Sequence, residues 1–325
     1  MIDTVQEQKM KIVIQGIACT VIIFLFSLYF PIIGFVCALF LPLPILIYRL
    51  KYGKANGIKI VCGTLGAILM FLRDITPDFL FFGGFLLIGW ILSECIERKM
   101  SIEKMILYTC GIVVLSLISL LLLIYGLGQE PGLYTIISNY IKQNLVNTLS
   151  LYKEIGVSPE HVQVLSNSLD EIAYVLIRIL PGLLISGVLV TSWLNLIMAI
   201  PLLKKWNLML THLGLSNQWK APDNLVWGVI VSGIVLLVIP NVSIKLFFLN
   251  VLIILMTLFF FQGMAIVSFI LNKYKLPNSI KAFCYTIIAI QQWMLFMVIG
   301  IGLFDIWFNF RKFASSYHED ADIDE

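Results

Sequence analysis

The chain has 325 residues, of which 60% are hydrophobic and only 13% are charged, and its formal net charge is +3. A water-soluble domain usually carries about twice that charged fraction. This composition excludes an ordinary soluble protein. Apolar runs of about 18 or more residues, the length that crosses a bilayer, recur along nearly the whole chain. The sequence therefore predicts an all-α, polytopic transmembrane helix bundle with the lipid bilayer as its first partner.

In chain order, apolar runs bounded by proline, glycine and charged residues predict eight or nine membrane spans. Their boundaries are set by Pro31, by Gly53 and Gly57, and by Pro201 and Pro240, where a helix cannot continue unbroken. The nine candidate spans are 12–30, 32–48, 57–72, 76–96, 104–127, 169–200, 224–240, 243–271 and 279–308.

Lysine and arginine predict the orientation, because cytoplasmic loops carry an excess of them. With the N-terminus in the cytoplasm, fifteen basic residues fall on the inner side and four on the outer side. The outer four are Arg73, Lys142, Lys153 and Lys245. Arg311 and Lys312 do not fit, because nine full spans would place this basic pair outside. Either one candidate span does not cross, or the last helix ends outside despite the pair.

The long segment before the sixth span has a helical pattern of its own. Apolar residues recur at helical spacing on one face, and the other face is polar. These residues are Leu133, Ile137, Tyr140, Ile141, Leu145, Leu149 and Tyr152. The pattern predicts an outer amphipathic helix at about 132–155. The predicted organisation is a six-span bundle over 1–205, two or three spans over 206–312, and a disordered acidic tail over 313–325.

The sixth span contains one arginine, Arg178, in the run AYVLIRILPGLLISG. It lies about 13 Å along the helix from the predicted outer end, and an arginine at this depth usually faces the bundle interior or a wet cavity. Pro181 frees a backbone carbonyl one turn earlier. We interpret Arg178 as binding an anionic ligand group, with the structural alternative of an ion pair or a side chain that reaches the headgroups.

Acidic and aromatic residues on the outer side complete this candidate site. Asp74 and Asp78 lie in the turn between the third and fourth spans. Glu171, Tyr174 and Trp193 fall on the same helical stripe as Arg178. Near the end of the chain, Asp305 is expected to pair with Arg311 or Lys312 beside an interfacial aromatic belt.

Motifs for enzymatic chemistry are absent from the sequence. It contains no GxxxxGK[ST], HExxH or GxSxG motif, and its six cysteines and three histidines do not cluster. We therefore expect no ATPase or other enzymatic activity, no cofactor, no metal and no nucleic-acid partner.

Three stretches carry a resemblance to a known family. They are FLPLPILIYRLKYG (40–53), FQGMAIVSFILNKYKLP (261–277) and GLFDIWFNFRK (302–312). In these the chain resembles the YybS-like family of bacterial membrane proteins, which has no assigned function, and the resemblance implies a multi-pass protein of the bacterial plasma membrane.

The first six spans also resemble, more distantly, the substrate-binding S components of energy-coupling factor transporters. That resemblance implies capture of a small solute at the outer face, with a separate coupling subunit and ATPases as partners. The extra spans after residue 205 and the long loop before the sixth span depart from that pattern. The alternative function is a non-enzymatic scaffold or regulator of other membrane proteins.

Overall fold

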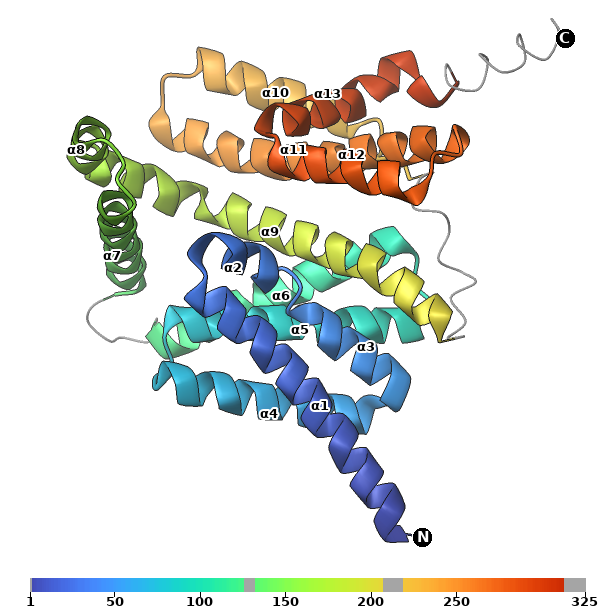
Figure 1. The fold of residues 1–325 in the computed structure, drawn as a ribbon. Coiled ribbons are helices and arrows are strands. Elements are labelled where there is room, and N and C mark those ends of the chain that lie inside the picture. Colours follow the sequence, from blue (N-terminus) through green and yellow to red (C-terminus); the bar gives the residue numbers. More distant parts are fainter. Residues whose placement is uncertain (1, 126–131, 207–218, 313–325) are drawn as a thin grey trace, which may run out of the picture. The chain divides into compact units, whose positions relative to one another are not determined.

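The computed structural model describes residues 2–125, 132–206 and 219–312, and all regular structure in these ranges is helical. The helices are labelled in Figure 1. The first six are α1 (Ile2–Tyr29), α2 (Pro31–Ala38), α3 (Pro42–Tyr52), α4 (Lys54–Leu72), α5 (Pro77–Glu97) and α6 (Ile102–Tyr125). They are followed by α7 (Leu133–Glu154), α8 (Pro159–Asn167), α9 (Leu169–Lys205), α10 (Leu225–Val238), α11 (Val242–Lys273), α12 (Asn278–Ile290) and α13 (Gln292–Phe308).

Local chemistry explains several of the helix ends. Pro77 is in the first turn of α5, where its missing N–H costs nothing. Thr76 precedes it and accepts a hydrogen bond from the Phe79 N–H at 3.4 Å. Gly53 separates α3 from α4 with a φ of 88°, a conformation that glycine adopts without strain.

Seven of the described segments are long and apolar enough to cross a membrane, and an eighth is added if α12 and α13 count as one bent span. The protein is therefore an all-α polytopic membrane protein. Four of the nine predicted spans differ from expectation. The 32–48 candidate is divided into α2 and α3, and α9 continues through Pro201 to Lys205 instead of ending at this proline. The 224–240 candidate is α10, which has only 14 residues. The 279–308 candidate is broken at Gln291, whose backbone is extended, and its two halves are bent by 103°.

The chain divides into two compact units. Among the described residues, the first contains 2–177 and 187–206, and the second contains 178–186 and 219–312. The predicted boundary at 205 lies close to this division, but the middle of α9 belongs to the second unit. The predicted acidic tail at 313–325 lies outside the described residues.

Within the first unit, polar contacts show which helix ends lie together. The Lys51 ammonium at the end of α3 lies 4.1 Å from the ring centre of Trp206, which follows α9. At the opposite end of α9, Asp170 pairs with Lys142 of α7 at 2.7 Å. The 37 residues of α9 correspond to about 55 Å, so these two contacts lie at well-separated ends of the helix.

Candidate functional site

Arg178 lies in the part of α9 that belongs to the second unit, and its side chain is half-buried. Pro181 follows three residues later, yet α9 stays helical through this point. Because proline has no N–H, the carbonyl one turn before it loses its usual partner. In α9 this carbonyl belongs to Ile177, the residue before Arg178.

Asn250 of α11 forms hydrogen bonds with two backbone groups of the same part of α9. Its side-chain oxygen accepts a bond from the Gly182 N–H at 2.6 Å, and its side-chain nitrogen donates to the Arg178 carbonyl at 2.8 Å. In a regular helix these two backbone groups would pair with each other. The amide of Asn250 also donates to Leu246 of its own helix at 2.7 Å. Asn250 thus clamps the turn of α9 that carries Arg178.

Gly182 permits this close approach. A side chain at this position would place its first carbon 2.7 Å from the side-chain oxygen of Asn250 and 3.0 Å from the Asn250 Cα atom. Contacts this short with a backbone atom cannot be relieved by a rotamer change alone. The sequence run Arg178, Pro181 and Gly182 and the distant Asn250 therefore form one structural feature.

The structure places the other five predicted site residues in the first unit, whereas Arg178 is in the second. Asp74 accepts a bond from the neighbouring Ile75 N–H at 2.7 Å. Glu171 and Tyr174 are exposed on α9, and Trp193 is half-buried further along the same helix. The grouping of these residues with Arg178 around one ligand stays a prediction.

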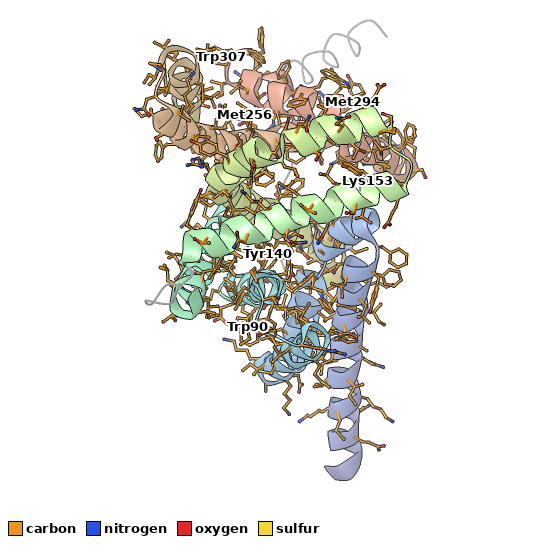
Figure 2. All side chains as sticks on the ribbon, turned by 90° about the vertical axis from the view of Figure 1, so that its left-hand side faces the viewer. Trp90, Tyr140, Lys153, Met256, Met294 and Trp307 are labelled. Atoms are coloured by element: carbon orange, nitrogen blue, oxygen red, sulfur yellow. The ribbon has the colours of Figure 1, made fainter. Side chains whose placement is uncertain are left out.

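Asp78, the remaining predicted residue, contacts the amphipathic helix α7. Its carboxylate accepts a hydrogen bond from the hydroxyl of Tyr140, a residue labelled on α7 in Figure 2. Burial, together with this hydrogen bond to a carboxylate, raises the pKa of Tyr140, which keeps the phenol protonated and able to donate. Together with the pair between Lys142 and Asp170, this bond ties α7 to the first turns of α5 and α9.

The predicted apolar stripe of α7 is its less exposed side. Leu133, Ile137, Tyr140, Ile141, Leu145 and Leu149 are all half-buried, whereas Tyr152 at the end of the helix is exposed. The polar positions between them are mostly exposed. An amphipathic helix with this pattern rests its apolar face on other apolar surface and leaves its polar face to water.

A network of charges at the other end of the first unit was not predicted from the sequence. Arg49 of α3 is fully buried. Its guanidinium pairs with Glu94 and, at 3.3 Å, with Glu97 of α5. It also donates to the Trp90 carbonyl at 2.5 Å and stacks over the Trp90 ring at 4.0 Å.

Two more cations neutralise the same carboxylates. Lys54 of α4 lies 2.9 Å from Glu94 and 3.6 Å from Glu97, and Arg98 lies 3.1 Å from Glu94. The network joins α3, α4 and α5. One signal for it was present in the sequence, since Glu94 and Glu97 are three residues apart and share a helix face.

The second unit contains a buried carboxylate, Asp305. Its oxygens accept bonds from the Gln262 amide at 3.1 Å and from the Phe310 N–H at 2.9 Å. Arg311 donates to the Trp219 carbonyl at 2.6 Å. Burial lowers the pKa of Arg311, and the negative charge of Asp305 opposes that effect. Asp305 thus bonds to Gln262 and Phe310, and its expected pairing with Arg311 or Lys312 stays a prediction.

Within the part of the chain that the structure describes, histidine, cysteine and acidic side chains form no group of three that could hold a metal ion. Polar features of the described residues include the Asn250 clamp, the α7 contacts, the network around Arg49 and the contacts of Asp305. Each connects helices that are far apart in the sequence.

A comparison with known protein families shows to which family the chain belongs. The model of the family described as Predicted membrane protein (DUF2232) matches residues 18–306. The chain belongs to this family. It is a family of membrane proteins of unknown function, and the match agrees with the resemblance in the three quoted stretches. Comparisons with curated proteins and with solved structures found no match.

Proposed function

We propose that this DUF2232 protein is a non-enzymatic subunit of the bacterial plasma membrane that binds a small anionic solute for transport. The observation that carries the proposal is Arg178, an ionisable residue inside a long apolar helix, on the turn that Asn250 clamps. Ionisable residues within membrane spans commonly mark ligand or ion pathways.

The local backbone supports a binding role for this turn. Transporters often place their sites where a membrane helix is interrupted and its polar backbone groups are exposed to a ligand or a cavity. In this chain α9 stays continuous, but Pro181 removes one of its backbone hydrogen bonds and Asn250 binds two of the backbone groups beside Arg178. A guanidinium here would bind a carboxylate or phosphate group of the solute through paired hydrogen bonds.

The remaining parts of the proposal follow the predicted orientation. Asp74, Asp78 and Glu171 would shape the outer approach to Arg178, and Tyr174 and Trp193 would line the solute's path. As in the S components that the first six spans resemble, energy would come from a separate coupling subunit and ATPases. The chain would not hydrolyse ATP.

Native mass spectrometry of the purified protein in detergent tests this function. Arg178→Ala is compared with Arg73→Asn, which removes an exposed arginine outside the spans and places asparagine in a left-handed backbone conformation that it tolerates. We expect a small anionic molecule to co-purify with the wild type and with Arg73→Asn, and to be lost from a folded Arg178→Ala protein. Retention of that molecule by Arg178→Ala would contradict the proposal.

The alternative is a scaffold or regulator of other membrane proteins. It is favoured by the network around Arg49, in which buried charges are used to join three helices. If no solute co-purifies and Arg178→Ala folds poorly, Arg178 has a structural role of the same kind and the scaffold becomes the better description.

A further inference from the structure

The last two helices of the second unit form a bent pair whose path decides on which side of the membrane the chain ends. α12 and α13 meet at Gln291 with a bend of 103°, which fits either one broken span or a loop that enters and leaves on the same side. The sequence left this open, because Arg311 and Lys312 did not fit nine full spans. Contacts within the second unit favour one of the two paths.

The first step concerns α10 and α11, which form an antiparallel hairpin. The Ala221 N–H, just before α10, donates to the side-chain oxygen of Gln262 at 3.3 Å. Seven residues further on, Gly228 faces Leu255 of α11, seven residues before Gln262. As the residue number increases along α10, the number of the facing residue in α11 decreases. The two helices are therefore antiparallel, and α10 lies beside the first part of α11.

The second step places the end of α13 along this hairpin. Asp305 accepts a bond from Gln262, and Arg311 donates to Trp219, which precedes α10. Both contacts lie where α10 begins. A ninth crossing would instead bring Arg311 to the end where α10 stops at Val238. That end is about 20 Å away along α10, and an arginine side chain cannot cover this distance.

The third step concerns depth in the bilayer. Gln262 is about 30 Å along α11 from Val242 and lies in the half of this helix that ends at Lys273. The cluster of Asp305 and Arg311 therefore lies on the side of the second unit where α11 ends, which is also the side of Trp219. Exposed aromatic rings of Phe304, Trp307 and Phe308 surround it, as is typical of the interface.

We infer that α12 and α13 form a re-entrant pair, and that α10 and α11 are the only crossings between residues 219 and 312. The contacts of Asp305 and Arg311 return the end of α13 to the side from which α12 starts. Lys220, Lys273, Lys275 and Lys281 then share one side with Arg311 and Lys312, and Lys245 is on the other. With six candidate spans before residue 206, Ile2 and Lys312 then lie on the same side.

Labelling of introduced cysteines with a membrane-impermeant maleimide tests this topology in the full chain. The variants Lys220→Cys, Lys245→Cys, Gln291→Cys and Lys312→Cys are labelled in intact and in permeabilised cells, with the unmodified chain giving the background of its six native cysteines. We expect Lys245→Cys alone to be labelled in intact cells, and Lys220→Cys and Lys312→Cys only after permeabilisation.

Each contrary pattern has a defined meaning. If Lys312→Cys and Lys245→Cys are both labelled in intact cells while Lys220→Cys is not, α12 and α13 make a ninth crossing and the inference fails. If Gln291→Cys is labelled in intact cells, the pair reaches the far surface and is not re-entrant. If Lys220→Cys and Lys245→Cys behave alike, α10 does not cross and the inference also fails. None of these outcomes depends on whether the protein binds a solute.

Discussion

Arg49 shows how a single buried charge can organise a membrane protein. Its side chain has no solvent exposure, so its positive charge is stabilised by side chains of α5 instead of by water. The carboxylates of Glu94 and Glu97 are themselves partly exposed, at 25% and 33%. Water therefore reaches the acidic side of the network but not the guanidinium, and the loss of Arg49 should cost more than the loss of an outer cation.

We predict that Arg49→Met lowers the free energy of unfolding by about 2–4 kcal/mol, because removal of one member of a buried ion pair leaves its partners uncompensated. The matched control is Arg98→Gln, which removes an arginine that is 66% exposed from the same carboxylate. That change should cost less than about 1 kcal/mol. Thermal unfolding of both proteins in detergent measures the difference, and equal losses would show that Arg49 has no special role.

Asn250 is the second residue whose substitution we expect to lower the stability of the protein strongly. We predict that Asn250→Leu destabilises the protein by about 1–3 kcal/mol, because the Gly182 N–H and the Arg178 carbonyl both lose a hydrogen-bond partner. Thr257→Val, on the same helix, removes a hydroxyl that bonds only to its own helix at Ile253. The control should change stability by clearly less, and an effect as large as that of Asn250→Leu would argue against the clamp.

Helix packing in the second unit depends on glycines where α11 and α13 cross. A side chain on Gly302 would collide with the Phe259 carbonyl, and one on Gly263 with the Val298 carbonyl. Small residues at such crossings let two helix backbones approach closely, which is the main source of packing energy between helices in lipid. The crossing also positions Asp305 beside Gln262.

Gly302→Ala should therefore destabilise the protein by about 1–3 kcal/mol through overpacking. Gly300→Ala is the control, because a side chain at Gly300 meets no atom within 4 Å among the described residues. That change should be neutral or stabilising by about 0.5–1 kcal/mol, as expected when alanine replaces glycine in a helix. Unfolding in detergent distinguishes them, and similar behaviour of the two variants would contradict the close crossing.

At the scale of the whole molecule, the first unit has two chemically different ends. One holds Lys51, Lys54 and Arg98 together with the buried Arg49, and the other holds the contacts of α7 with Asp78 and Asp170. The basic end matches the cytoplasmic side that the distribution of lysine and arginine predicts. The contacts show which helix ends lie together, at the Arg49 end or at the α7 end. The distribution of lysine and arginine then predicts which of these ends faces the cytoplasm.

We predict that Lys104→Cys, at the start of α6, is labelled by an impermeant maleimide only in permeabilised cells, and that Asn147→Cys on α7 is labelled in intact cells. Both positions are exposed, so access to the reagent differs only by side. Labelling of both positions in intact cells would show that these two segments share a side. A reversed pattern would leave the fold intact and invert its orientation.

The sequence by itself determined the class of this protein, the helical stripe of α7 and most of the spans. Apolar length and periodicity are local properties, and the bilayer permits few alternatives to a helix. It did not reveal that Asn250 binds the α9 backbone at Arg178, that Arg49 is buried between acidic residues, or that α13 returns to the start of α10. These features join residues that are 41 to 92 positions apart in the chain. Such pairings leave no periodic trace in either segment, because they depend on which helix faces which, and only the tertiary structure decides that.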